Sequence, residues 1–123
     1  MKEGKTMSNW KMNMYFSDYV QEDVYQLYYK AADGEKRYSR FSFSYPVAAT
    51  LIDLLDNSEI MADVATYNKM DAAAIFSSSE ARKIRGKITT AFDAKRKAYR
   101  KDGDPMDSIN CIAWLSELSK VAE

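Results

Sequence analysis

Hydrophobic and polar residues alternate in three segments near the start of the 123-residue chain. These segments are Trp10–Phe16, Val24–Ala31 and Tyr38–Tyr45. A repeat of two residues is typical of a β-strand with one buried face. The Asp-Gly pair in "ADGEK", between the second and third segments, is a preferred hairpin turn. We therefore expect three consecutive antiparallel strands.

From Pro46 onward the apolar residues recur at helical spacing. Proline suits the first turn of a helix, so the first helix is expected over about Pro46–Asp56. Residues 58–76 are expected to form one or two short helices. Strands followed by helices predict a single α+β domain over residues 1–123, with strands at about 10–45 and helices at about 46–122. The helical half is expected to pack on one face of the sheet.

Capping signals place two further helices. Ser77 stands three residues before Glu80, which is the spacing of a capping box. A helix over about Glu80–Lys101 follows, and the sequence "DGDP" ends it. Pro105 then opens the last helix. The apolar residues available for burial in that helix are Ile109, Ile112, Ala113, Leu115 and Leu118.

Histidine is absent and Cys111 is the only cysteine. This composition removes the usual general base near neutral pH and the common zinc ligands, so it excludes Ser–His, Cys–His and zinc chemistry. The sequence also lacks a paired-acid motif and a glycine-rich phosphate loop, so we expect a non-catalytic protein without metal or cofactor. Cys111 lies in an apolar helical pattern and is expected to be a buried structural thiol in a reducing compartment.

Membrane and export signals are missing from the pattern. The chain has no run of about 18 apolar residues, and no apolar segment follows its charged first residues. We therefore expect no membrane partner, no secretory signal and a cytoplasmic location.

The predicted strands divide their residues between two faces. The apolar face, expected to form the core beneath the helices, collects Trp10, Met12, Met14, Phe16, Tyr25, Leu27, Tyr29, Phe41, Phe43 and Tyr45. The opposite face combines tyrosines, basic side chains and small polar groups, without a carboxylate. Its members are Lys11, Asn13, Tyr15, Gln26, Tyr28, Lys30, Tyr38, Arg40, Ser42 and Ser44.

The polar face suits a single-stranded nucleic acid. Bases stack on flat rings for about 1–3 kcal/mol each, while basic groups follow the phosphates. The candidates are Tyr15, Tyr28 and Tyr38 for stacking, and Lys11, Lys30 and Arg40 for phosphates. Two other interpretations stay open. Tyrosine and arginine are enriched at protein interfaces, and a solvated face can carry tyrosines for cross-strand pairing alone.

Charge is segregated along a chain that is neutral overall, with 18 basic and 18 acidic residues. Residues 46–79 are acidic in balance, and residues 80–102 are strongly basic. A solvated helix face explains such a basic run, as does an extension of the phosphate path. No helix-turn-helix spacing supports insertion into duplex DNA. The candidate phosphate contacts of this segment are Arg82, Lys83, Arg85, Lys87, Lys95, Arg96, Lys97 and Arg100.

The stretches "WKMNMYF", "DVYQLYYKAADGEKRYSRFSFSY" and "PVAATLIDLL", over Trp10–Leu55, follow one another as an aromatic-rich sheet and a helix. This pattern resembles the Whirly and Pur-type single-strand binders. The small size, mixed composition and lack of histidine are also similar to the single-stranded-DNA-binding cofactors that some lytic phages encode beside their own RNA polymerase. That resemblance implies cooperative, sequence-independent binding, a homo-oligomer, an RNA polymerase partner, a role in phage transcription and a location in the host cytoplasm.

The sequence thus favours a non-catalytic single-stranded-DNA-binding protein. One alternative is a protein-interaction module, such as a phage inhibitor or adaptor of a polymerase or defence enzyme. A second alternative is binding of single-stranded RNA, which the sequence does not separate from DNA.

Overall fold

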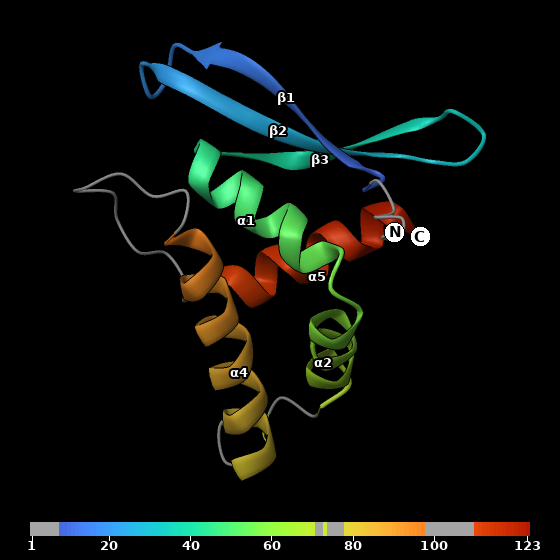
Figure 1. Cartoon of the computed structure of the whole chain (residues 1–123), viewed down its shortest axis with the longest axis vertical. Helices are drawn as coiled ribbons and strands as arrows, with labels where there is room; N and C mark the ends of the chain where they lie inside the picture. Colours follow the sequence, from blue (N-terminus) through green and yellow to red (C-terminus); the bar gives the residue numbers. More distant parts are fainter. Residues whose placement is uncertain (1–7, 71–72, 74–77, 98–109) are drawn as a thin grey trace, which may run out of the picture.

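Three strands open the fold in the computed structural model, which describes residues 8–70, 73, 78–97 and 110–123 (Figure 1). They are β1 (Trp10–Ser17), β2 (Glu22–Lys30) and β3 (Lys36–Phe43). They form one antiparallel sheet in the order β1-β2-β3, which makes β2 the central strand. The predicted three-stranded antiparallel sheet is confirmed.

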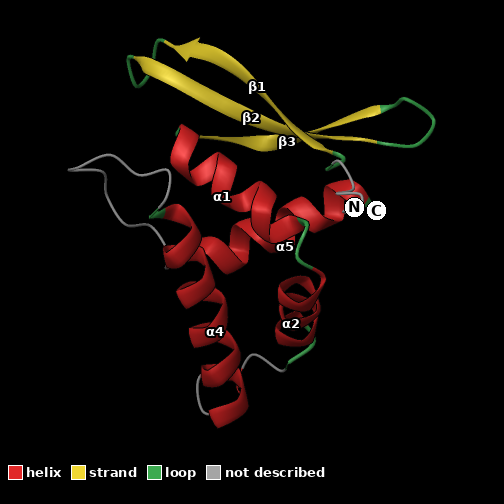
Figure 2. Cartoon of the chain, viewed as in Figure 1, coloured by secondary structure: helices red, strands yellow, loops and turns green. Residues whose placement is uncertain are grey.

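Helices follow the sheet, as the sequence predicts for an α+β fold. They are α1 (Tyr45–Leu55), α2 (Ser58–Asn68), α4 (Ser79–Arg96) and α5 (Cys111–Ala122). α1 and α5 pack directly on the strands, and α2 and α4 pack on α1 and α5 (Figure 2). All four lie on the same side of the sheet, so its opposite face carries none of the described helices (Figure 1).

The turn between β2 and β3 depends on Gly34. Its φ of 91° lies in the left-handed region, which glycine adopts without a Cβ clash. The Gly34 N–H donates to the Ala31 carbonyl at 2.9 Å, and the Ala31 N–H donates to the Glu35 carbonyl at 2.8 Å. The predicted Asp-Gly hairpin is confirmed.

The third strand ends earlier than predicted. Phe43 is its last residue, Ser44 is the N-cap of α1, and Pro46 lies in the first turn of that helix. Tyr45 therefore belongs to α1, where it is 46% exposed and packs edge-on against Tyr25 at a centroid distance of 5.4 Å. The expected places of Ser44 on the polar sheet face and of Tyr45 in the core strand are wrong.

Polar side chains cap α2 and α4. The Asn57 side chain accepts a hydrogen bond from the Ile60 N–H at 3.1 Å, and the Ser78 hydroxyl accepts one from the Glu80 N–H at 3.1 Å. The cap of α4 is thus Ser78, whereas the predicted cap, Ser77, lies outside the described residues. Such caps satisfy backbone donors that the first turn leaves open.

α4 and α5 are described over part of their predicted lengths. α4 is described as far as Arg96, and α5 begins at Cys111 after an N-cap at Asn110. The predicted extension to Lys101 and the predicted start at Pro105 lie outside the described residues.

The core lies between the sheet and the α1–α5 layer. Leu27 of the central strand is completely buried, and Phe43 meets Trp114 of α5 edge-on at 5.1 Å. Burying such side chains stabilises a fold by about 1.5–3 kcal/mol each relative to exposure. The completely buried leucines of the cluster are Leu27, Leu51, Leu54, Leu115 and Leu118.

The apolar face of the sheet is not covered by the described helices near the turn between β1 and β2. Met14 is 55% exposed and Phe16 is 56% exposed, whereas Met12 packs against the core. α1 has 11 residues, or about 16 Å of helix, whereas the eight residues of β1 span about 27 Å. The helix is too short to cover the whole strand. The expectation that Met14 and Phe16 belong to the core is therefore wrong.

Arg37 joins the sheet to the end of α5. Its Nη1 donates to the Ala122 carbonyl at 3.2 Å and to the backbone oxygen of Glu123, and its Nε donates to Glu35 at 2.8 Å. The Glu35 carboxylate raises the pKa of Arg37 further above its ordinary value. This contact fixes α5 against β3.

Within the described ranges, the structure contains no helix that combines the length and the apolar character needed to cross a membrane.

The sole cysteine provides a test of the core. Cys111 is completely buried, and this burial, helped by the negative charge of Asp93, raises the pKa of its thiol to about 12. Only about one thiol in ten thousand is then ionised at pH 8. We expect no reaction with Ellman's reagent in the native protein, and full reaction once guanidinium has unfolded it. Fast labelling of the native protein would contradict this burial.

Candidate functional site

The open face of the sheet carries a row of three side chains from three strands. The register places Lys11 of β1 opposite Tyr28 of β2, and Tyr28 opposite Tyr38 of β3. In the next row of this face, Lys30 of β2 stands directly opposite Lys36 of β3. We call these five residues the tyrosine–lysine face.

The two tyrosines of this face form a tilted ring pair. The ring centroids of Tyr28 and Tyr38 are 5.1 Å apart and their planes are inclined by 34°. The Lys36 Nζ lies 5.5 Å from the centroid of the Tyr28 ring. Tyr28 is consequently half-buried between its neighbours, whereas Tyr38 is 49% exposed. Tyr38 therefore offers the more accessible ring, and Tyr28 supports it.

The three lysines of the face have no acidic partner among the described residues. None of Lys11, Lys30 and Lys36 forms an ion pair with the described part of the chain. Like charges directly opposite each other on neighbouring strands, as Lys30 and Lys36 are, destabilise a sheet by some tenths of a kcal/mol. A bound anion would remove this repulsion.

Lys36 was not among the candidates from the sequence. It precedes Tyr38 by two residues, so the alternation places it on the same face. The third strand was predicted to begin at Tyr38, whereas β3 begins at Lys36. Extending the alternation by one step toward the Asp-Gly turn would have found it.

Tyr15 lies on the open face but at a distance from the pair of Tyr28 and Tyr38. Its hydroxyl and the Ser42 Oγ are 2.8 Å apart, a hydrogen bond that crosses over β2. Along β1 it is four residues from Lys11, or about 14 Å. Tyr15 is 44% exposed, so it provides a second ring farther along the sheet.

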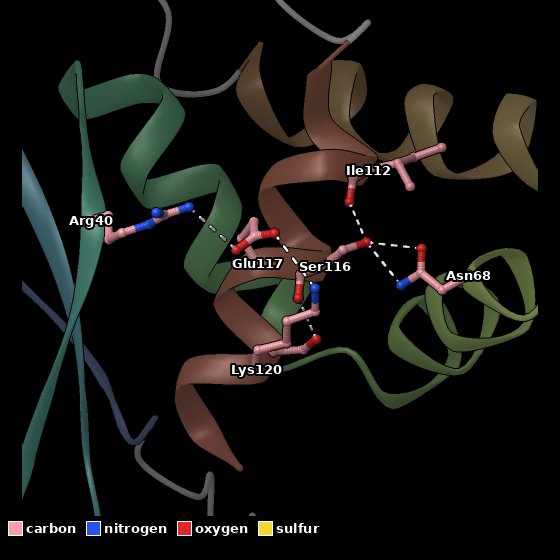
Figure 3. A network of polar contacts seen from close by, with 7 residues as sticks. Arg40, Asn68, Ile112, Ser116, Glu117 and Lys120 are labelled. Atoms are coloured by element: carbon pink, nitrogen blue, oxygen red, sulfur yellow. Dashed lines mark hydrogen bonds and ion pairs between the residues drawn. The ribbon is translucent and has the colours of Figure 1, made fainter.

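Arg40 does not join the tyrosine–lysine face. The register between β2 and β3 shifts, so that residues 39–41 of β3 lie opposite Leu27 alone. At this point the Gln26 side chain donates a hydrogen bond to the Ser39 carbonyl at 2.9 Å. From this irregular segment the Arg40 guanidinium reaches toward α5, where its Nη2 is 3.9 Å from Glu117 Oε2 (Figure 3). The expected position of Arg40 beside Tyr28 is wrong.

The network around Glu117 belongs to helix packing. The Lys120 Nζ is 3.5 Å from the Glu117 carboxylate, and the Asn68 side-chain amide of α2 donates to the Ser116 Oγ of α5 at 2.9 Å (Figure 3). These contacts join β3, α5 and α2. Arg40 is thus placed in a structural network of the helical side, although its side chain is 81% exposed.

The open face is not wholly free of acids. β2 begins at Glu22, two residues before its predicted start, and Glu22 stands opposite Ser17 on the face that also carries Gln26 and Tyr28. The expectation of a face without a carboxylate is wrong at this end. Six residues along β2 separate Glu22 from Tyr28, about 20 Å, so the tyrosine–lysine face itself contains no acid.

Part of the basic helix is used inside the molecule. Lys87 of α4 lies 2.9 Å from the Glu59 carboxylate and 3.0 Å from the Asp63 carboxylate of α2, and these two contacts raise the pKa of its ammonium group. Arg85 donates to the Tyr67 hydroxyl of α2 at 3.4 Å. The acidic and basic segments of the sequence therefore pair with each other across the α2–α4 contact.

The other basic residues of this segment are divided. Arg96 is 1% exposed and is therefore inaccessible to a phosphate, in contrast to the expectation. α4 packs on the helices and lies on the far side of them from the open sheet face (Figure 1). Its exposed basic residues thus do not continue the tyrosine–lysine face, and Arg100 lies outside the described residues. Besides Lys87, the exposed set is Arg82, Lys83, Lys95 and, at the C-cap of α4, Lys97.

Among the described residues, no group of three or more cysteine, aspartate or glutamate side chains is arranged to hold a metal ion.

Compared with known proteins, the chain matches no protein-family model, no curated protein and no solved structure. Function has to be inferred from the residues of the sheet and helices themselves.

The burial of Arg96 is testable by mutation. We expect Arg96→Ala to lower the free energy of unfolding by about 1–3 kcal/mol, because a long packed side chain and its polar contacts are lost from the interior. The control Lys95→Ala, at an exposed neighbour, should change it by less than about 0.5 kcal/mol. Urea denaturation followed by circular dichroism measures both. Equal stability of the two variants would place Arg96 at the surface.

Proposed function

We propose that the protein binds single-stranded DNA on the tyrosine–lysine face. The observation that carries this proposal is the row Lys11–Tyr28–Tyr38 beside the opposed pair Lys30 and Lys36, on a face that none of the described helices covers. It combines an accessible tyrosine ring with three cations that have no acidic partner in the described chain.

The chemistry of this face suits bases and phosphates together. A base stacks on the exposed side of Tyr38, while Lys11 in the same row and the lysine pair in the next row contact the adjacent phosphates. Stacking and phosphate contacts do not distinguish the hydrogen-bonding edges of the bases, and they do not depend on groove shape. The binding is therefore expected to be largely independent of sequence.

The proposed site is narrower than the one expected from the sequence. Arg40 reaches toward α5 and Arg96 is buried, so neither belongs to it. The exposed cations of α4 lie on the helical side, and we leave them out of the path. Tyr15 is kept as a second stacking position farther along β1.

Replacing Tyr38 tests the stacking. Tyr38→Ala should weaken binding to a fluorescein-labelled oligo-dT by about 5- to 140-fold, which corresponds to the loss of one stacked base, about 1–3 kcal/mol. Tyr38→Phe keeps the ring and should bind like the wild type. Fluorescence anisotropy at low ionic strength measures both. Equal affinity of the alanine variant and the wild type would remove Tyr38 from the site.

Replacing the opposed lysines tests the phosphate contacts. For single strands, the slope of log K against log salt is about −0.7 for each phosphate neutralised. Lys30→Gln with Lys36→Gln should therefore make this slope less steep by about 1.4. The matched control, Lys83→Gln with Lys95→Gln, removes two exposed charges from α4 and should leave the slope unchanged. An unchanged slope for the Lys30 and Lys36 variant, with a less steep slope for the Lys83 and Lys95 variant, would place the phosphate contacts on α4 instead.

Two further binding measurements distinguish the alternatives, which are binding of single-stranded RNA and binding of another protein. Competition between matched DNA and RNA strands distinguishes the two nucleic acids, through any contact with the 2′-hydroxyl. Undetectable affinity for both, together with a protein captured after nuclease treatment, would favour the protein-interaction module. An RNA polymerase partner belongs to the proposal only through the resemblance to phage single-strand binders, and capture of a phage polymerase would test it.

A further inference from the structure

The exposed apolar end of the sheet lies on β1 and the adjoining turn. Met14 and Phe16 point to the helical side of the sheet but extend beyond the helices, and Val20 of the turn is also exposed. Alternate residues of the same strand, Lys11 and Tyr15, face the open side. β1 thus presents an uncovered apolar side and a polar side along one edge of the sheet.

The two edges of the sheet differ in protection. β3 carries Lys36, Arg37 and Arg40, has the irregular segment opposite Leu27, and contacts α5. Charges, bulges and covering elements are the usual means of blocking an edge strand from pairing. β1 has only Lys11 as a charged residue, contains no proline, and pairs with β2 in unbroken register. β1 is therefore the edge that can accept another strand.

The hydrogen bonds within the sheet show which backbone groups of β1 point away from β2. The Lys30 N–H donates to the Asn9 carbonyl at 2.9 Å, so Asn9 and Lys30 are a hydrogen-bonded pair. Such pairs alternate along an antiparallel ladder. The odd-numbered residues of β1 therefore bond to β2, and the even-numbered residues Met12, Met14 and Phe16 direct their N–H and C=O groups to the open edge.

We propose that two copies of the chain pair antiparallel along β1, about a two-fold axis that passes beside Met14. Each Met14 then stands opposite Met14 of the second copy, and Phe16 stands opposite Met12 of the second copy. The even-numbered residues make the new hydrogen bonds, as their free backbone groups require. The two sheets become one sheet of six strands, with both helical layers on the same side.

A second copy fits this edge better than an unrelated strand, because the side chains of β1 complement one another when the strand pairs with itself. On the helical side it places Phe16 beside Met12, which already packs against the core of its own copy. On the open side it places Lys11 opposite Ser17 of the second copy. Within that copy Ser17 of β1 stands opposite Glu22 of β2, so Lys11 lies in the same row as this carboxylate. This brings the only cation of β1 toward the acidic end of the other open face and opposes no like charges.

The mass in solution tests the pairing. Without nucleic acid, light scattering should give twice the 14.1 kDa chain mass for the wild type. Met14→Lys brings two ammonium groups together at the axis and should give a monomer with an unchanged circular dichroism spectrum. The control Asn13→Lys adds the same charge on the open side, opposite a tyrosine, and should stay dimeric. A wild-type monomer throughout a dilution series overturns the proposal, whatever the affinity for DNA.

Cross-linking tests the register. The Cα atoms of the two Met14 residues should be about 5.5 Å apart, whereas those of the two Phe16 residues are separated by about 14 Å along the strands. Met14→Cys should cross-link rapidly to itself with a short bis-maleimide, since the native Cys111 is buried. Phe16→Cys alone should not, but it should cross-link with Met12→Cys when the two variants are mixed. A dimer without the Met14→Cys cross-link overturns the proposed pairing.

Discussion

The structure depends on the burial of one face of the sheet beneath α1 and α5, centred on Leu27 of the middle strand. A small sheet gains independent stability only when such a face is covered. Here the cover is shorter than the strands, because a helix rises about 1.5 Å per residue and a strand about 3.4 Å. The same packing therefore creates a closed core around Leu27 and an uncovered apolar end at Met14 and Phe16. The other face remains open for polar residues (Figure 1).

Alternation along the strands predicted which side of the sheet a residue occupies, but not what covers that side. It placed Tyr28 and Tyr38 together on the open face, as the register has them. It also assigned Met14 and Phe16 to the core, because the alternation carries no information on where along the strand the covering helix lies. Arg40 was misplaced for another reason: the register shift in β3 allows an edge residue to turn toward α5, and nothing in "YSRFSFSY" indicates that shift.

In α4 the residue spacing was enough to predict the burial of Arg96 but not the ion pairing of Lys87. Arg96 follows Ile88 and Phe92 at steps of four, so it stands on the buried stripe and its burial was predictable. The pairing of Lys87 with Glu59 depends on how α2 and α4 cross, which a single sequence does not specify. Opposite net charges in two adjacent segments were nevertheless a sign of two segments that face each other rather than a ligand.

Both proposals use β1, because alternate residues of one strand serve its two sides. Lys11 contributes to the open face, and Met14 lies at the edge that would join two copies. Pairing along β1 would leave Tyr28 and Tyr38 of both copies on the same side of one twisted sheet. A single strand of nucleic acid that contacted both copies would then favour the dimer, and by reciprocity the dimer would bind that strand more tightly than the monomer does. Short oligonucleotides, confined to one copy, would not gain from the pairing.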